Sequence, residues 1–322
     1  MSEDGAMRIA VLVGGIGGAR FLMGVRRLPA EVTAIVNTAD DLTLHGLRVC
    51  PDLDSVMYTL GDGADPERGW GRAGESFTVG SELAEYNAEA PWFSLGDKDL
   101  ATHLVRTRML DAGYGLTAVT AALCERWKPG VELLPMSDDR VETHVVVSDE
   151  DGRRAIHFQE WWVRHRGKIE TDRFVFTGAA QAKPAPGVIE ALRDADAVLI
   201  APSNPVVSIA PILGVPGIRE VLRSTSAPVV GVSPIIAGAP VRGMADRCLE
   251  VLGEPVTAQA VGAMFGPRHD GEGVLDAWLV DETDRNTTID GLTVGSAPLW
   301  MSSPEATEAM ARAALELVEV TA

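Results

Sequence analysis

The feature that most constrains this chain is a short apolar run that leads directly into a glycine-rich loop. Residues 8–13 are almost entirely apolar, as a buried strand requires, and the run Gly14-Gly15-Ile16-Gly17-Gly18-Ala19-Arg20 follows at once, before an amphipathic helical pattern. A strand, a glycine turn and a helix in this order point backbone N–H groups and a helix N-terminus at a phosphate. We therefore expect Gly14, Gly15, Gly17 and Gly18 to bind a diphosphate, although such turns also form for packing alone. The spacing matches neither a strict G-x-G-x-x-G nor a P-loop.

Four carboxylates lie just beyond a second predicted strand. Residues 31–36 form that strand, and Asp40, Asp41, Asp52 and Asp54 follow within a short stretch. Ligands of open α/β sheets bind at the carboxyl ends of the strands, and Mg²⁺ favours one or two carboxylates together with phosphate oxygens. We expect Asp40 and Asp54 to bind Mg²⁺ and to act in catalysis, with Asp40 in a surface turn. For Asp41 and Asp52, capping and turn formation are equally good explanations.

Two later strands end in polar turns of the same kind. The strand predicted at residues 197–200 ends in Ser203-Asn204-Pro205, and the strand at 228–232 ends in Ser233. Ser and Asn side chains donate and accept hydrogen bonds, so they suit a base, a ribose or a phosphate. Simple turn chemistry explains Ser233 equally well. Lys98 could neutralise a phosphate, but a solvated lysine at a helix start is the simpler explanation.

Charge and cysteine content restrict the function and the location. A formal net charge of -18 repels nucleic acid, and it means that a phosphorylated substrate needs a local cation or metal. Three scattered cysteines indicate neither a disulfide framework nor a zinc cluster. The acidic start Met1-Ser2-Glu3-Asp4 lacks the basic residues of a signal peptide, and apolar runs are too short or too broken to span a bilayer. We expect a cytoplasmic protein without nucleic-acid or membrane partners.

The organisation expected is one domain, residues 1–322, of the α/β class. Its Rossmann-like, doubly wound, mainly parallel sheet is predicted to come from residues of about 7–60 and 185–265, with a helical insertion at about 61–130. Strand patterns predict a small β-rich subdomain at about 131–180, and residues 266–322 form a C-terminal segment ending in a helix capped by Ser303. Trp161 and Trp162 are expected in the core of the subdomain, with a dimer contact as the alternative.

Taken as a set, the motifs resemble the CofD family, the transferases that complete the phosphodiester of coenzyme F-420. The resemblance covers about residues 7–265. It depends on the glycine loop and on seven further short runs in the family's order. These runs are Asn37-Thr38-Ala39-Asp40-Asp41, His45-Gly46-Leu47, Pro51-Asp52-Leu53-Asp54, residues 95–103, Pro135-Met136-Ser137-Asp138-Asp139, Ser203-Asn204-Pro205-Val206-Val207-Ser208-Ile209 and Ser233-Pro234-Ile235-Ile236. Residues 157–164 resemble the actinobacterial branch in particular. A small departure is Ala39, which stands where the family usually has Gly.

The resemblance implies a Mg²⁺-dependent transfer between two small molecules. A phosphorylated three-carbon acid, lactyl or enolpyruvyl, would move from a guanosine diphosphate carrier onto the deazaflavin Fo, and GMP would leave. The guanosine diphosphate carrier would lie against the glycine loop, Ser203-Asn204-Pro205 and Ser233. Asp54 and Lys98 would contact Fo, and Asp54 could also bind metal or orient the attacking hydroxyl. We further expect a homodimer.

Two other functions remain open from the sequence. One is a non-catalytic relative of the same superfamily that binds a nucleotide sugar and acts as a regulator. It would share the glycine loop and the Asp pair, but the motifs around Asp54 and Lys98 are not expected in it. The other is a dinucleotide-dependent oxidoreductase, in which Asp40 would bind the ribose.

Overall fold

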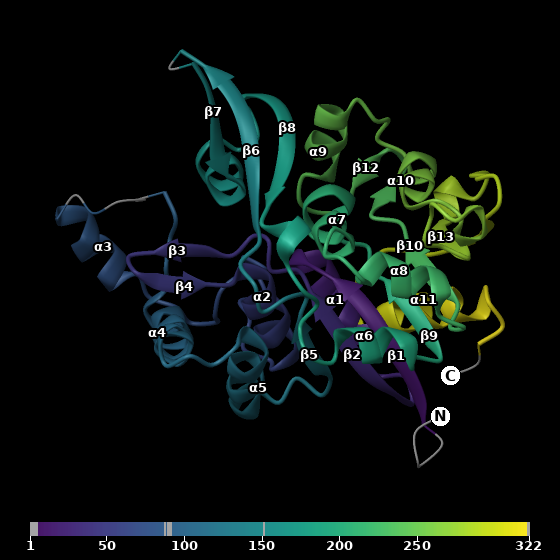
Figure 1. Ribbon diagram of the computed structural model, residues 1–322, viewed down its shortest axis with the longest axis horizontal. Coiled ribbons are helices and arrows are strands. Elements are labelled where there is room, and N and C mark those ends of the chain that lie inside the picture. Colours follow the sequence, from purple (N-terminus) through teal and green to yellow (C-terminus); the bar gives the residue numbers. More distant parts are fainter. Residues whose placement is uncertain (1–5, 87, 89–91, 151, 321–322) are drawn as a thin grey trace.

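A seven-stranded parallel sheet forms the centre of the computed structural model, which describes residues 6–86, 88, 92–150 and 152–320 (Figure 1). The strand order is β14-β13-β10-β9-β1-β2-β5, and every neighbouring pair is parallel. The strands are β1 (Met7–Val13), β2 (Ala30–Val36), β5 (Glu132–Pro135), β9 (Ala197–Ile200), β10 (Val229–Val232), β13 (Ala277–Asp281) and β14 (Thr293–Ala297). The expected α/β class with a doubly wound sheet is confirmed.

Helices cover both faces of this sheet. In β1, Ile9, Val11 and Val13 pack into one hydrophobic core, whereas Ala10 and Leu12 pack into the other. The first core is covered by α1 (Gly15–Val25), α2 (Pro51–Leu60), α5 (Leu116–Trp127) and α11 (Pro304–Glu316), and the second by α6 (Val188–Arg193), α7 (Ala210–Leu213), α8 (Ile218–Ser224) and α10 (Ala258–Phe265). Burial on both faces explains why the strands are continuously apolar.

The strand order reverses between β1 and β9, and this reversal fixes the place of the site. From β1 the chain runs to β2 and β5 on one side, and it later returns to β9 and continues to β10, β13 and β14 on the other side. The connections that follow β1 and β9 therefore run in opposite directions, and a crevice opens between them at the carboxyl ends of these two strands. The glycine loop follows β1 and the Ser203 turn follows β9, so two motifs far apart in sequence meet there.

The sheet is wider than the sequence pattern suggests. β5 lies inside the segment expected to be a separate β-rich subdomain, and β13 and β14 lie in the C-terminal segment, yet all three belong to the central sheet. β14 is an edge strand with no buried residue and β5 is only four residues long, so the pattern of each is weak. The cap of the last helix is as expected, because Ser303 Oγ accepts a hydrogen bond of 3.2 Å from the Ala306 N–H.

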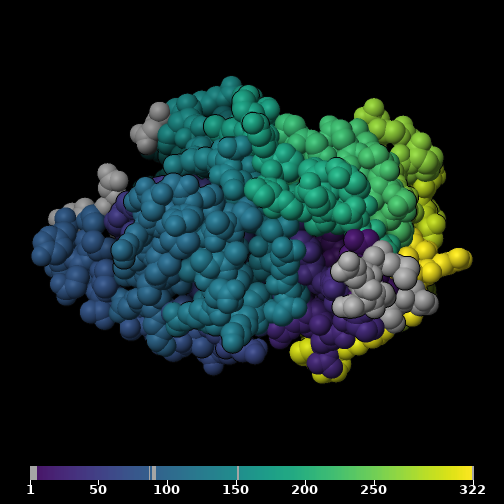
Figure 2. Space-filling model, turned by 60° about the horizontal axis from the view of Figure 1, so that its bottom comes forward, coloured from purple at the N-terminus to yellow at the C-terminus, as the bar shows by residue number. Residues whose placement is uncertain are grey.

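Two smaller units extend from the sheet on the side of the crevice (Figure 1). The first contains the hairpin β3 (Leu42–Leu44) and β4 (Leu47–Val49) with α3 (Thr78–Glu85) and α4 (Asp97–Asp111), and the second is the antiparallel sheet β6 (Glu142–Asp149), β7 (Gly152–His157) and β8 (Glu170–Thr177). In the space-filling view the first unit, in blue, lies at the opposite end of the molecule from the yellow C-terminal segment (Figure 2). Short elements complete the fold: a π-helical turn η1 (Glu160–Arg164), a second one η3 (Pro205–Ile209), α9 (Ala245–Leu252), β11 (Ile235–Ile236), β12 (Ala239–Pro240), and the 3₁₀ turns Ala179–Gln181, Arg268–Asp270 and Glu282–Asp284.

Two expectations about apolar residues can be compared with the fold. Trp161 is fully buried, as expected, whereas Trp162 is 37% exposed and lines the cavity described below. In the described part of the chain, no single helix has the length and apolar character needed to cross a membrane. Only the segments Pro205–Leu213 and Ile218–Ser224 taken together, with a bend of 82° between them, meet those criteria.

Candidate active site

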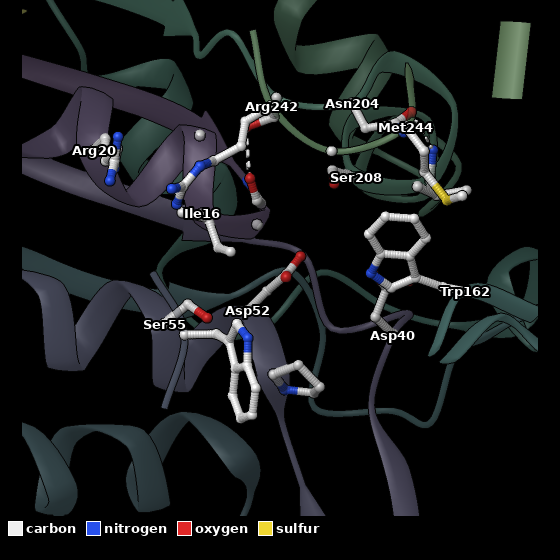
Figure 3. A pocket seen from close by; sticks show the side chains of 18 of the residues that line it. Ile16, Arg20, Asp40, Asp52, Ser55, Trp162, Asn204, Ser208, Arg242 and Met244 are labelled. Carbon is white, nitrogen blue, oxygen red and sulfur yellow. Dashed lines mark hydrogen bonds between the residues drawn. The ribbon is translucent and has the colours of Figure 1, made fainter. Parts of the chain in front are cut away.

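A cavity of about 980 Å³ lies at the carboxyl ends of β1, β9 and β10. The glycine loop, the Ser203 turn and Ser233 follow these three strands and form its floor, while residues of α2, α4 and the loops near Trp162 and Arg242 form its walls. Figure 3 shows side chains from the glycine loop, α2, the Asn204 turn and the loops near Trp162 and Arg242 around the same space. The volume is at the upper end of the range for small-molecule sites, so it has room for two substrates.

The glycine loop leaves the N-terminus of α1 bare toward the cavity. Helix α1 has no side-chain cap and no acidic residue in its first turn. A Cβ on Gly14 would lie 2.7 Å from Ser208 Cβ and 2.8 Å from Asp52 Oδ2, and Gly15 has a φ of +64°. Gly14, Gly15 and Gly17 line the cavity, as expected, whereas Gly18 packs against Val13 and Ser203 instead. The Gly14 N–H donates to Ser203 and the Gly15 N–H to Asp52, so the positive end of the helix dipole is what suits this loop to an anion.

The polar side chains in the turns after β9 and β10 form most of their hydrogen bonds within the protein. Ser203 Oγ accepts from the Gly14 N–H at 3.2 Å and donates to the Gly14 carbonyl at 2.7 Å, so it ties the two loops together. Asn204 Oδ1 caps η3 by accepting from two backbone N–H groups, and Pro205 begins η3 and does not line the cavity. Ser233 closes its own turn through the N–H and carbonyl of Ile235. These residues shape the floor, and contacts from them to a base stay predictions.

Asp40 and Asp52 form a buried carboxylate pair on the cavity wall. They are 4% and 6% exposed, so Asp40 does not lie in the surface turn that was expected. Burial raises the pKa of Asp40 well above its usual value, and the neighbouring carboxylates of Asp52 and Asp41 raise that pKa further. Burial also raises the pKa of Asp52 to about 6, while a hydrogen bond of 2.9 Å from Asn37 Nδ2 opposes that shift. Asp41 lies beside them, pairs with Arg48 at 3.1 Å and does not line the cavity.

The Asp40 and Asp52 pair fits a divalent cation. Asp40 Oδ1 is buried without a hydrogen-bond partner, and both residues adjoin the bare helix end where a phosphate would supply further oxygen ligands. Mg²⁺ needs only one or two carboxylates at such a site. Among the described residues, no cluster of three or more His, Cys, Asp or Glu side chains has the arrangement of a metal site. A metal here would therefore depend on the substrate for part of its coordination.

Asp54 belongs to a different cluster and is engaged by an arginine. Both of its carboxylate oxygens accept hydrogen bonds from the Arg106 guanidinium, one of them at 3.1 Å. Burial lowers the pKa of Arg106, but Asp54, Cys50 and Tyr58 together more than offset this effect and raise the pKa above its usual range. His103 lies beside the pair, and burial lowers the pKa of its imidazole to about 4. Asp54 lines the cavity, so it can accept a hydrogen bond from a substrate, whereas the arginine makes it a poor metal ligand.

Lys98, which the family resemblance assigns to Fo, does not line the cavity. Its side chain is exposed, and its Nζ donates a hydrogen bond of 2.9 Å to the Ala73 carbonyl. The structure therefore brings together Asp40, Asp54, three of the four glycines, Ser203, Asn204 and Ser233, but not Lys98.

Three arginines on the cavity wall were not identified from the sequence. Arg20, Arg166 and Arg242 line the cavity, and none of them forms an ion pair with a carboxylate in the described part of the chain. Figure 3 shows Arg20 and Arg242 near Ile16 of the glycine loop, with Trp162 on the other side of the space. Burial and the charge of Arg242 lower the pKa of Arg20. The signal in the sequence was the net charge of -18, which required a local cation at an anion site.

Aromatic side chains contribute a large share of the cavity wall. The cavity is lined by Tyr58, Trp70, Trp92, Phe93, Phe158, Trp162 and Trp300. Aromatic residues make up only 5% of the chain, so this concentration is informative. Flat aromatic surfaces suit the stacking of a planar ring system. The cavity thus combines an anion-binding end, a carboxylate pair and a surface for an aromatic ligand.

Comparisons with known proteins agree with this description. The family model described as "2-phospho-L-lactate transferase CofD" matches residues 9–307. A protein named phosphoenolpyruvate transferase from Mycolicibacterium smegmatis is 60% identical, over 98% of this chain and 100% of its own. One of the same name from Thermobifida fusca is 59% identical, over 97% and 98%. A crystal structure of a UPF0052 family protein from Bacillus halodurans has a TM-score of 0.53 at 21% identity, over 86% of this chain and 80% of that one, and supports the fold alone.

Proposed function

Because the chain belongs to the CofD family, we propose a specific form of the family reaction for it. The protein is a transferase of coenzyme F-420 biosynthesis. It moves a phosphorylated three-carbon acid from a guanosine diphosphate carrier to the deazaflavin Fo, and GMP leaves. We propose that the acid is the enolpyruvyl form, because relatives at 59% and 60% identity are named phosphoenolpyruvate transferase. The non-catalytic alternative gains no support, since these relatives are named as enzymes.

The observation that carries the proposal is the charge arrangement around the glycine loop. Within the described residues, Arg20 and Arg242 form no ion pair with a carboxylate and lie beside the N-terminus of α1, although the protein as a whole is strongly acidic. A diphosphate binding there would gain charge-assisted hydrogen bonds from Arg20 and Arg242, neither of which forms an ion pair with a carboxylate in the described part of the chain. We assign the diphosphate of the donor to this end of the cavity.

We propose that Asp40 and Asp52 hold Mg²⁺ against this diphosphate, in place of the expected pair of Asp40 and Asp54. When bound, the cation supplies charge neutralisation of the transferring phosphoryl group. Two observations support this assignment. Asp40 Oδ1 is buried without a hydrogen-bond partner, and the pKa values of both carboxylates are raised, so a cation would compensate their negative charge.

Asp54 orients the attacking group in this proposal. Its carboxylate is held in one orientation by two hydrogen bonds from Arg106 and faces the cavity. It accepts the hydrogen bond of the terminal hydroxyl of Fo and so points that oxygen at the phosphorus for an in-line displacement. Fixing this geometry removes much of the entropy cost of bringing two substrates together. The deazaflavin ring stacks on the aromatic wall.

The decisive experiment is product analysis with both donors side by side. Purified protein is mixed with Fo, Mg²⁺ and either the enolpyruvyl or the lactyl guanosine diphosphate donor, and products are identified by mass spectrometry. We expect dehydro-F-420-0 and GMP from the first donor at a higher kcat/KM than F-420-0 from the second, and no product from the first when Asp54 is replaced by Asn. The KM for Fo is also compared between Lys98→Ala and the control Lys168→Ala, which changes another exposed lysine. A higher KM in Lys98→Ala alone would support the Fo contact that the family implies, whereas an unchanged KM would agree with the position of Lys98 outside the cavity. Absence of transfer with both donors would refute the proposed function.

A cytoplasmic location and a homodimer belong to the same proposal. The few unpaired cysteines support a reducing compartment. Light scattering of the purified protein measures the oligomeric state directly.

A further inference from the structure

His103 of α4 is a buried histidine on the cavity wall for which the proposed reaction has no use so far. It is 1% exposed and lines the cavity beside Asp54, with its Nδ1 at 3.7 Å from Asp54 Oδ2. Asp99 lies one helical turn earlier on the same face of α4 and lines the cavity too. The two residues therefore present side chains to the same region of the cavity.

Arg106 fixes which ring nitrogen of His103 carries the proton. Its Nη1 lies 3.1 Å from His103 Nδ1. A guanidinium has only N–H donors and no acceptor, so Nδ1 takes the acceptor role in this contact, beside the Asp54 carboxylate and the Arg48 carbonyl that accept from the same Nη1. The proton of the neutral imidazole is then on Nε2. Arg106 cannot turn away, because Asp54 accepts from both of its terminal nitrogens.

The Nε2–H group that results has no partner among the described residues. Nε2 is buried and makes no hydrogen bond, and Oδ1 of Asp99 is buried without a partner as well, while the Tyr58 hydroxyl interacts with the same carboxylate. Buried polar groups are almost always hydrogen-bonded, so an orphaned donor and an orphaned acceptor on one cavity wall point to a ligand that supplies both partners. A hydroxyl group does so, because its oxygen accepts and its hydrogen donates.

We propose that His103, in its Nε2–H tautomer, is a specificity-determining donor to the hydroxylated side chain of the acceptor substrate, with Asp99 accepting from the same chain. This inference rests on the proposed function, in which Asp54 holds the terminal hydroxyl of that chain. A polyol places hydroxyls on successive carbons, so a hydroxyl next to the one held by Asp54 reaches the adjacent His103. The row Asp54, His103 and Asp99 then selects a polyhydroxylated chain over an unsubstituted one.

The first test reads the tautomer and the contact without measuring activity. Long-range ¹H–¹⁵N spectra of protein labelled at histidine report which ring nitrogen is protonated, and the His103 signals are those lost in His103→Gln. We expect the Nε2–H tautomer in the free protein and a shift of the Nε2 resonance on addition of Fo. An Nδ1–H tautomer, or an Nε2 resonance that Fo leaves unchanged, would overturn the inference.

The second test measures affinity by the fluorescence of the deazaflavin. We expect His103→Leu to weaken Fo binding roughly ten- to hundredfold and His103→Gln, which keeps an N–H donor, to weaken it less. GDP binding should be unchanged in both, as should Fo binding in the exposed control His269→Leu. A deazaflavin that lacks the hydroxylated chain should bind wild type and His103→Leu equally.

The role of His103 and the proposed function can be refuted separately. If the wild type transfers to Fo but His103→Leu and His103→Gln both bind Fo as wild type does, only the role of His103 is wrong. If the wild type neither binds Fo nor transfers to it, the proposed function is wrong and the acceptor contact is wrong with it. Circular dichroism and the unchanged GDP affinity show that each variant is folded.

Discussion

Breaking the buried pair of Asp54 and Arg106 gives a prediction whose size follows from the structure. Asp54 is 5% exposed and Arg106 is 1% exposed, and the two are joined by two hydrogen bonds. Arg106→Met removes the cation but keeps most of the side-chain volume. The carboxylate is then left buried without its partner, a change that typically costs about 3–5 kcal/mol of folding free energy.

The carboxylate can limit this cost by taking up a proton, and that sets a pH dependence. Protonating an aspartate at pH 7 costs about 4 kcal/mol, because its reference pKa is about 3.9 and each pKa unit is worth about 1.4 kcal/mol. At pH 5 the same step costs only about 1.5 kcal/mol. A carboxyl whose pKa is raised in the folded state favours folding at low pH and loses that contribution as the pH rises. The destabilisation by Arg106→Met should therefore be largest at pH 7 and shrink toward pH 5.

The assay is urea unfolding of the wild type, Asp54→Asn, Arg106→Met and the double variant at both pH values. Asp54→Asn leaves Arg106 buried without a counter-charge, so each single variant should lose several kcal/mol at pH 7. The double variant should lose clearly less than the sum, with a coupling of about 2 kcal/mol or more for a pair in direct contact. Additivity within about 0.5 kcal/mol, or a cost of Arg106→Met that does not fall at pH 5, would refute the reasoning.

Three further predictions concern the anion-binding end of the cavity. Asp40→Asn should leave the metal-free protein at least as stable as wild type, because it removes a buried unpaired charge, and should abolish the thermal shift that Mg²⁺ produces with GDP; an undiminished Mg²⁺ shift contradicts the metal assignment. Gly14→Ala should lower the free energy of unfolding by about 1–3 kcal/mol through overpacking and should weaken GDP binding. The control Gly80→Ala, where a Cβ meets nothing closer than 3.9 Å, should be neutral or slightly stabilising. Equal effects of the two substitutions on thermal unfolding would rule out the close approach at Gly14. In EDTA, stability should fall as the pH rises through about 6, since burial raises the pKa values of Asp52 and Asp41 to about 6; a melting temperature that increases from pH 5 to pH 7 would show that these carboxylates are compensated in another way.

Local patterns were sufficient to predict most of the individual elements. The strand at β9 begins and ends where the apolar pattern predicts, and the cap at Ser303 is identified directly from the sequence. These features depend on residues a few positions apart, so a single sequence contains them. The three strands β5, β13 and β14 were not assigned to the sheet, because membership of a sheet depends on partners far away in the sequence.

In the candidate site too, some residues could be identified from the sequence and others only from the structure. The glycine loop and the acidic residues after β2 were identified from the sequence because strand ends and glycine spacing are local signals. Arg20, Arg166 and Arg242 were not, because an arginine is informative only when its surroundings lack a carboxylate. The family pattern placed Lys98 against a substrate, and the fold directs its side chain to the Ala73 carbonyl outside the cavity.

The sequence by itself determined the class of fold, the family and the end of the sheet at which chemistry takes place. Only the tertiary structure separated the carboxylates, pairing Asp54 with Arg106 and leaving Asp40 beside Asp52. The reason is physical. Burial and neighbouring charge decide whether a carboxylate holds a cation, a proton or an arginine, and both are set by segments that come together only on folding.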